Sequence, residues 1–288
     1  MRIAAWFSLV KFSHSIFALP FALMGAWLAA DGLPEARVGA LIIVCAVSAR
    51  TAAMGFNRLV DRRIDALNPR TAQRELPAGV LRPAAVGALV LLSSVVFVGA
   101  AFLLNAPSGW LSLPVLFVLL SYSLVKRFSW MAHAVLGLAL GLAPLGAWMA
   151  VRGDFEGDLW QPLALAAAVL TWVMGFDLIY SCQDVGFDRD QRLHSIPARF
   201  GIAGALRISS LLHLLTLGLM LLVGWRAELG WIFHGVLLVA AGLLYWQHRI
   251  VRPDDLSRVD MAFFTLNGWV SVAFFVGTAL DLGWGRPL

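Results

Sequence analysis

The sequence is poor in charge and in cysteine. Only 14% of its 288 residues are Asp, Glu, Lys or Arg, whereas soluble domains contain roughly 25%. The two cysteines, Cys45 and Cys182, are too few for a disulfide framework or a thiolate metal cluster. Apolar residues make up 60% of the chain and the mean hydropathy is +0.80. A soluble fold would leave aggregation-prone apolar patches at this composition, so we predict an integral membrane protein.

Long apolar segments define the expected fold. About 20 apolar residues in a helix cross the ~30 Å hydrocarbon core of a bilayer. We therefore predict an all-α polytopic protein with nine transmembrane helices. The nine predicted segments are 13–30, 38–56, 84–104, 109–125, 130–150, 160–179, 203–223, 230–248 and 260–280.

The positive charges separate by side of the membrane. With nine spans, eighteen of the 22 Lys and Arg residues fall on the side of the N-terminus, and four fall on the other side. Cytoplasmic loops carry the excess of Lys and Arg in membrane proteins. We therefore expect the N-terminus and the loops 57–83 and 181–202 to be cytoplasmic. The cations form no soluble basic domain, so a nucleic-acid partner is not expected.

A stripe of oxygen-bearing side chains follows the second predicted span. Asn57, Asp61 and Asp65 are spaced i, i+4, i+8, which places them within roughly 80° on one face of a helix. Such a stripe suits Mg²⁺, which takes oxygen ligands together with water and substrate phosphate. Candidate anion-binding cations lie within this stripe and in the loop after it, namely Arg58, Arg70 and Arg74.

A second stripe repeats this spacing later in the chain. Tyr180, Asp184 and Asp188 also stand at i, i+4, i+8 and precede another Arg-rich loop. One such stripe alone is usually a solvated helix face, but two matched stripes on one side of an apolar protein indicate a shared site. Carboxylates, Mg²⁺ and several Arg together favour a polyphosphate ligand. We therefore predict a single domain, 1–288, with pseudo-duplicated halves of roughly 1–128 and 129–288.

With these motifs, the chain resembles the UbiA superfamily of intramembrane prenyltransferases. The residues from Asn57 to Gly79 match N-x-x-x-D-x-x-x-D and N-P-R-T-x-x-R-x-L-P-x-G, and those from Asp177 to Asp188 match D-x-x-Y-x-x-x-D-x-x-x-D. A third motif, Y-x-x-x-K-R, ends at Lys126 and Arg127. The resemblance implies helices around a central cavity capped by cytoplasmic Asp-rich loops, in the inner (plasma) membrane of a bacterium.

The resemblance also implies a reaction, the transfer of a polyprenyl group from polyprenyl diphosphate to a ring carbon of a hydroxylated aromatic acid. Mg²⁺ would be held by the four Asp residues of the two stripes, with Asn57, while Lys126 and Arg127 offset charge on the leaving diphosphate. Aromatic side chains such as Phe56, Phe187 and Tyr180 would shield the allylic cation. The expected metal ligands are Asp61, Asp65, Asp184 and Asp188.

The acceptor is less well defined by the motifs. The segments around Arg50 and His194 look like the branch linked to bacterial menaquinone synthesis through futalosine, whereas the 4-hydroxybenzoate enzymes tend to have Lys where His194 stands. The expected acceptor is therefore of the 4-hydroxybenzoate or the 1,4-dihydroxy-6-naphthoate type. His194 itself is expected to contact diphosphate, to move a proton or to cap a helix.

Two ionisable residues lie within or beside the predicted spans. Arg50 stands two turns before Asn57 on the same face, where it would bind the carboxylate of the acceptor, snorkel to the interface or pair with Asp177. Asp177, at the membrane boundary, is expected to be functional and to position Tyr180 or Arg50. The remaining histidines show no ligand spacing and are expected to be structural, namely His133, His213, His234 and His248.

Other functions stay open at this point. An ion- or proton-coupled transporter also places charges within a membrane protein, but it tends to do so at mid-bilayer on broken helices. The acidic residues here gather at one end of the spans, which favours the enzyme. Within the superfamily, haem, homogentisate or a lipid would be alternative acceptors.

Overall fold

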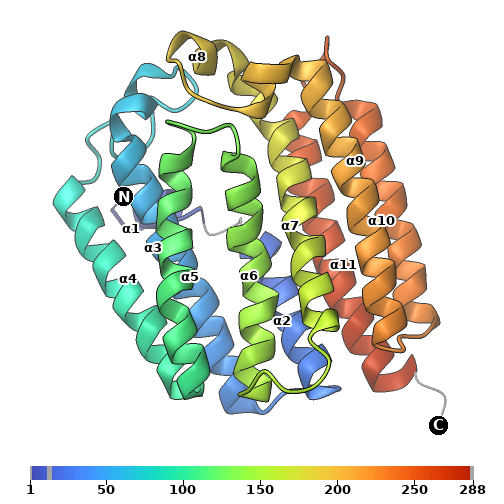
Figure 1. Cartoon of the computed structure of the whole chain (residues 1–288). Helices are drawn as coiled ribbons and strands as arrows, with labels where there is room; N and C mark the ends of the chain where they lie inside the picture. The colour runs from blue at the N-terminus through green and yellow to red at the C-terminus, as the bar shows by residue number, and fades with distance from the viewer. Residues whose placement is uncertain (1, 12–14, 286–288) are drawn as a thin grey trace.

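The computed structural model describes residues 2–11 and 15–285. Within these ranges the secondary structure is helical apart from one isolated bridge between Arg252 and Asp255. The long helices lie side by side along a common direction (Figure 1). They are α2 (Ser15–Ala30), α3 (Ala36–Leu67), α4 (Pro83–Leu104), α5 (Ala106–Val125), α6 (Ala132–Arg152), α7 (Trp160–Ser181), α9 (Ile196–Arg226), α10 (Trp231–Ile250) and α11 (Asn267–Leu280). The shorter elements are α1 (Arg2–Leu9), η2 (Cys182–Asp184), α8 (Val185–Asp190), η3 (Met261–Leu266) and η4 (Asp281–Gly285).

The helical fold agrees with the sequence analysis. Each of the nine predicted segments overlaps a long helix, and in the described ranges seven helical stretches are long and apolar enough to cross a membrane. α2 is a shorter apolar helix, and α10 is not among the seven. The all-α polytopic fold is therefore confirmed, while the number of nine crossings stays a prediction. The start of the segment predicted at 13–30 lies outside the described residues.

Close helix packing in the middle of the bundle depends on small residues. A Cβ atom at Gly137 of α6 would lie 2.5 Å from the Leu170 carbonyl oxygen of α7, and one at Gly141 would lie 2.6 Å from that of Ala166. Small residues allow this backbone approach where lipid provides no hydrophobic drive between helices. Beside this contact, a buried aromatic core centred on Trp172 packs α7 against α2 and α11.

α3 extends beyond the apolar part of its sequence. Its 32 residues correspond to roughly 48 Å at ~1.5 Å per residue, which exceeds the ~30 Å hydrocarbon core. The segment predicted at 38–56 counted only the apolar residues and therefore ended eleven residues before Leu67. The additional turns place the first oxygen-bearing stripe at one end of the bundle.

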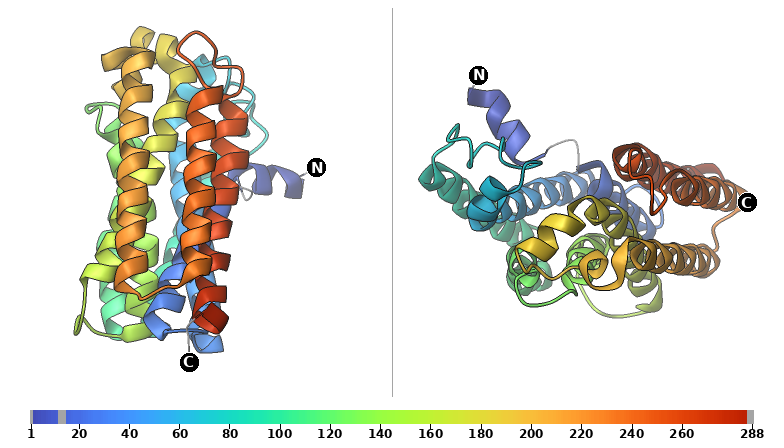
Figure 2. Two further views of the ribbon diagram at one scale, coloured as in Figure 1. Left: turned by 90° about the vertical axis from the view of Figure 1, so that its right-hand side faces the viewer. Right: turned by 90° about the horizontal axis from the view of Figure 1, so that it is seen from above.

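The polar connections gather at that same end. The loop after α3, the turn between α5 and α6, and α8 all lie there (Figure 1), and α8 lies over the end of the bundle when it is seen from above (Figure 2). α1 runs across the bundle rather than along it (Figure 2). Its Leu9 is buried against Leu76 and Leu81 of the loop after α3.

Candidate active site

A polar cavity of about 970 Å³ opens at this end of the bundle. Twelve of the fourteen site residues selected from the sequence line it. The other two are Asp65 and Arg127, which lie next to the cavity and bind residues on its wall or in its loops. The lining residues among the fourteen are Arg50, Asn57, Arg58, Asp61, Arg70, Arg74, Lys126, Asp177, Tyr180, Asp184, Asp188 and His194.

Asp61 is the buried centre of the first stripe. The residue is only 2% exposed, and its carboxylate accepts a hydrogen bond of 3.1 Å from Asn57 Nδ2. Lys126 Nζ lies 3.3 Å from one carboxylate oxygen and Arg127 Nη2 lies 3.1 Å from the other. Arg127 also donates to the Val60 carbonyl at 2.9 Å. The Y-x-x-x-K-R motif at the end of α5 therefore neutralises the first stripe directly.

Asp65 is held from the loop that follows α3. Arg74 Nη1 lies 2.8 Å from Asp65 Oδ1, and the Thr71 hydroxyl donates to the Asp65 carbonyl at 2.9 Å. Asp65 Oδ2 is buried and has no hydrogen-bond partner among the described residues. One carboxylate oxygen of Asp65 thus has no partner in the described ranges, and the other is bound by Arg74, which lines the cavity.

The second stripe is not on a continuous helix. α7 ends at Ser181, the 3₁₀ turn η2 contains Asp184, and α8 contains Asp188. The regular spacing in the sequence predicts one helix face, whereas the structure changes the helical period between Tyr180 and Asp188. All three side chains still line the cavity.

Arg70 joins the two halves of the site. Its guanidinium forms an ion pair with Asp184, with Nε 3.0 Å from Asp184 Oδ1, and it donates to the Tyr180 hydroxyl at 2.8 Å. Asn68 Nδ2 donates to the same Asp184 oxygen at 3.1 Å. The loop after the first stripe therefore binds the second stripe, so the two motifs form one site.

The cavity is electrostatically suited to an anion. Burial lowers the pKa of the Lys11 amine, and the nearby charges of Arg58 and Arg74 lower it further. At Arg70, burial lowers the guanidinium pKa, but the hydrogen bond and charge of Asp184 outweigh it and raise the pKa above its usual value. Arg70 therefore stays charged, and the surrounding cations repel one another where an anion would relieve them.

An all-oxygen donor set of this kind fits Mg²⁺ with water and phosphate oxygens as further ligands. The four aspartates lie in or beside one cavity, and Asp65 Oδ2 is buried without a partner in the described ranges. Within the same ranges, no three His, Cys, Asp or Glu side chains form a ready metal-ligand group. The basic side chains now bound to the carboxylates would have to exchange partners with the ion and its phosphate.

Arg50 and Asp177 do not form a pair. Arg50 Nη2 donates to the Lys11 carbonyl at 3.3 Å, and Asp177 Oδ2 lies 2.7 Å from His133 Nδ1. The expectation that Asp177 positions Arg50 is therefore wrong, because His133 occupies the partner position. His133, expected from the sequence to be structural, binds Asp177 and also lines the cavity.

Two further expectations are changed by the structure. His194 does not cap α9, because the side chain of the next residue, Ser195, accepts the capping bond from Ala198 N at 3.2 Å. Phe56 is not among the cavity-lining aromatic residues, whereas Phe187 and Tyr180 are. Phe263, 4.3 Å from Tyr180 between ring centroids, was missed because it lies in an apolar segment without a motif.

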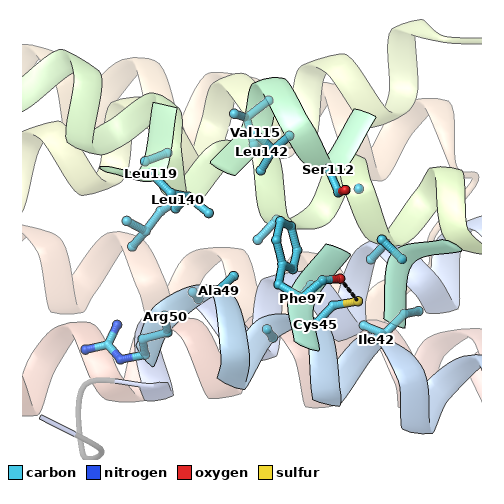
Figure 3. A pocket seen from close by; sticks show the side chains of 18 of the residues that line it. Ile42, Cys45, Ala49, Arg50, Phe97, Ser112, Val115, Leu119, Leu140 and Leu142 are labelled. Carbon is cyan, nitrogen blue, oxygen red and sulfur yellow. Dashed lines mark hydrogen bonds between the residues drawn. The ribbon is translucent and has the colours of Figure 1, made fainter. Parts of the chain in front are cut away.

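A second, apolar pocket continues from the polar cavity between α2, α3, α4, α5 and α6. Arg50, Met54, Tyr122, Leu136 and Leu140 line both spaces. Figure 3 shows Arg50 at one end of this pocket, with its remaining labelled lining mostly aliphatic. The two spaces together provide a polar end and a long apolar end for one amphiphilic ligand.

The comparisons with known proteins agree with this geometry. The model of the UbiA prenyltransferase family matches residues 18–270. A 4-hydroxybenzoate octaprenyltransferase of Nitrosomonas europaea is 33% identical, over 97% of this chain and 95% of the relative. The apo structure of a UbiA homologue from Aeropyrum pernix K1 is 35% identical, with a TM-score of 0.84 over 93% of this chain and 98% of that one. A UbiA homologue from Archaeoglobus fulgidus bound to DMAPP and Mg²⁺ is 15% identical, with a TM-score of 0.76 over 97% of this chain and 99% of that one, and shares the fold.

The helical bundle and its polyionic cavity define a membrane-embedded enzyme of the prenyltransferase class. The chain belongs to the UbiA prenyltransferase family. This membership decides between the enzyme and the transporter in favour of the enzyme.

Proposed function

We propose that the enzyme transfers a polyprenyl group from polyprenyl diphosphate to a ring carbon of a hydroxylated aromatic acid in quinone biosynthesis. The observation that carries this proposal is the direct continuation of a carboxylate- and Arg-lined cavity into an apolar pocket. An allylic diphosphate with a long hydrocarbon tail has the same division of polarity. The Nitrosomonas europaea relative, a 4-hydroxybenzoate octaprenyltransferase, supports an aromatic acid as acceptor.

The diphosphate end would lie between the two stripes. Asp61, Asp65, Asp184 and Asp188, with Asn57, would hold Mg²⁺, which supplies Lewis-acid stabilisation of the leaving diphosphate when it is bound. Arg58, Arg70, Arg74 and His194 would contact the phosphate oxygens, and Lys126 and Arg127 would offset their charge. The Archaeoglobus fulgidus homologue binds DMAPP and Mg²⁺, which supports a divalent metal here.

The prenyl chain would occupy the apolar pocket. Its walls come from five helices and include small residues such as Ala46, Ala49 and Ala143, which leave room for a hydrocarbon chain. Tyr180, Phe187 and Phe263 at the polar end would stabilise the allylic cation through their π faces and exclude water from it.

The acceptor would bind at the junction of the two spaces. Arg50 lines both of them and its Nε is buried without a partner in the described ranges. A guanidinium binds a carboxylate in bidentate fashion, which the ammonium of Lys does not. Both 4-hydroxybenzoate and 1,4-dihydroxy-6-naphthoate contain this carboxylate, so the role of Arg50 is the same for either acceptor.

The enzyme would lie in the inner membrane of a bacterium with both stripes facing the cytoplasm. The eighteen-to-four division of Lys and Arg supports this orientation. Single cysteine probes at positions 70 and 191 should react with an impermeant reagent in inverted vesicles only. Labelling of both probes in intact cells would overturn the orientation.

The decisive experiment uses membranes that contain the enzyme, radiolabelled polyprenyl diphosphate, Mg²⁺ and a panel of aromatic acids. We expect a labelled prenylated acid whose formation requires one acceptor of the panel and stops with a chelator. Membranes containing the Asp184→Ala variant at equal amount are the control. Release of diphosphate without any prenylated acid, or a product with a non-aromatic acceptor only, would overturn the proposed acceptor class.

A further inference from the structure

His133 and Asp177 form a bonded pair at the polar cavity that has no role in the proposed function. His133 lies in the first turn of α6 and Asp177 lies on α7, with Nδ1 2.7 Å from Oδ2. The His133 side chain is only 7% exposed and that of Asp177 is 20% exposed. His133 Nε2 is buried and has no hydrogen-bond partner among the described residues.

The partner of Nδ1 determines the state of the other nitrogen. An ionised carboxylate only accepts hydrogen bonds, so the proton of a neutral imidazole is on Nδ1 and Nε2 keeps its lone pair. A buried, unpartnered acceptor is costly in the absence of a donor from a ligand. The bond to Asp177 therefore fixes the His133 ring and leaves Nε2 as the ring nitrogen without a partner in the described ranges.

The His133 side chain acts electrostatically on Asp188, and its place on α6 also brings it toward the junction of the two spaces. Asp177 precedes Tyr180 by three residues and lies about one helical turn farther from Asp184. On α6, His133, Leu136 and Leu140 share one face, and the two leucines line both the polar cavity and the apolar pocket. His133 thus stands near the junction where Arg50 would bind the acceptor carboxylate.

We propose that His133, oriented by Asp177, is the general base that removes the proton from the ring hydroxyl of the acceptor. This proposal rests on the proposed function. An acceptor bound with its carboxylate at Arg50 would direct its hydroxyl group toward His133.

The carbon–oxygen bond to diphosphate breaks, and its electron pair leaves with diphosphate, so that the prenyl chain becomes an allylic cation. Nε2 takes the hydroxyl proton, and the oxygen electron pair drives a ring π pair onto the first carbon of this cation. The ring carbon then loses its proton to the released diphosphate, while Nε2 returns its proton to the ring oxygen. One C–H and one C–O bond are replaced by one C–C bond and one O–H bond on diphosphate.

The first test compares His133→Ala with wild type in detergent-purified enzyme. General base catalysis contributes about 10²–10⁴-fold, so we expect kcat to fall at least 100-fold with little change in the KM of polyprenyl diphosphate. His234→Gln is the matched control, because His234 bonds the Gly230 carbonyl of its own helix start and lies outside both cavities. Binding of polyprenyl diphosphate and the unfolding temperature of each variant report whether it is folded.

Acceptor acidity separates a base from a structural histidine. A series of acceptors with fluorine at ring positions other than the reacting carbon makes the hydroxyl progressively more acidic. At one fixed pH, the ratio of wild-type to His133→Ala rates should fall along this series, because an already ionised hydroxyl needs no base. A ratio that stays constant would overturn the proposal, as would a defect confined to the KM of polyprenyl diphosphate.

Asp177→Asn tests the orientation. The Asn amide would donate to Nδ1, which moves the proton to Nε2 and removes the base. We expect a loss similar to that of His133→Ala, and a double variant no worse than either single one. Additive losses would contradict a coupled pair. A wild-type enzyme that prenylates no aromatic acid would overturn the proposed function itself, which distinguishes that failure from a failure of the base alone.

Discussion

Asn57, Asp61 and Asp65 lie on the single uninterrupted helix α3, whereas Tyr180, Asp184 and Asp188 are divided among α7, η2 and α8. The two stripes also differ in burial. The side chains of Asp61 and Asp65 are 3% and 7% exposed, while the Asp184 side chain is 18% exposed. The first stripe is thus fixed by a long helix, and the second depends on a short turn.

The difference extends to what holds each stripe. Cations from the first half of the chain, Lys126, Arg127 and Arg74, bind the carboxylates of α3. Asp184 is also bound from the first half, by Arg70 and Asn68. The second stripe therefore takes its position from the loop of the first. Substitutions that leave the carboxylates in place should therefore affect the first stripe, which is fixed, differently from the second stripe, which depends on the first.

The largest effect should come from the carboxylates, and it should be similar for both stripes. Asp61→Ala, Asp65→Ala, Asp184→Ala and Asp188→Ala each delete oxygen ligands of the proposed Mg²⁺–diphosphate site, so we expect activity to fall about 10²–10³-fold. Product formation from labelled polyprenyl diphosphate measures the loss, and membrane fractionation checks insertion. Near-normal turnover that resists EDTA in two of these variants would rule out Mg²⁺ binding by the aspartates. It would also contradict the expectation that both stripes contribute equally.

Arg50 lies on α3 two turns deeper than Asn57 and tests the fixed helix away from its carboxylates. Loss of a charge-assisted hydrogen bond of ~1.5–3 kcal/mol should make Arg50→Leu raise the acceptor KM roughly 10–100-fold. The KM of polyprenyl diphosphate should change little, and Arg50→Lys should restore only part of the loss because it lacks the planar fork. A defect in the diphosphate KM would instead assign Arg50 to the diphosphate, and a defect in protein yield alone would assign it to the scaffold.

Arg70 tests the dependence of the second stripe on the first. Its side chain is 32% exposed, and solvent weakens such a pair, so we expect Arg70→Ala to cost about 1.4 kcal/mol, roughly tenfold in the KM of polyprenyl diphosphate. Arg74→Ala, which releases Asp65 instead, is the comparison variant. Limited proteolysis of the 181–202 loop should increase in Arg70→Ala and not in Arg74→Ala. Equal protection in both variants would show that the second stripe holds its own position.

The sequence predicts much of this arrangement because its strongest signals are local. Apolar length locates the helices, and the spacing of Asn57, Asp61 and Asp65 predicts their common face, since α3 is regular there. The same reasoning is wrong for Asp184, because a 3₁₀ turn keeps the residue spacing while it changes the angle per residue. Nothing in the spacing distinguishes these two cases.

Residue spacing in the sequence does not predict contacts between distant segments of the chain. The pairing of His133 with Asp177 joins residues 44 positions apart, and that of Arg70 with Asp184 joins residues 114 apart. Arg70 was selected because it belongs to a motif, whereas His133 belongs to none and was expected to be structural. The sign and density of charge thus indicated a polyanion site, but which cation binds which carboxylate follows from helix packing.

The smallest expected effect concerns the hydroxyl of Tyr180, which accepts the 2.8 Å hydrogen bond from Arg70. Tyr180→Phe removes this acceptor but keeps the ring that packs 4.3 Å from Phe263 and lies 5.1 Å from the Arg70 guanidinium carbon. Arg70 retains its ion pair with Asp184, so the loss should be ~0.5–1 kcal/mol, about two- to fivefold in the KM of polyprenyl diphosphate.

Tyr180→Leu is the matched variant, because it removes both the hydroxyl and the aromatic face. If the ring stabilises the allylic cation, this variant should lower kcat well beyond the effect of Tyr180→Phe, since a cation–π contact contributes most when the cation forms. Rates with saturating polyprenyl diphosphate separate the two contributions. Equal kcat values for Tyr180→Leu and Tyr180→Phe would confine the role of Tyr180 to holding Arg70. The second stripe would then act through its carboxylates alone.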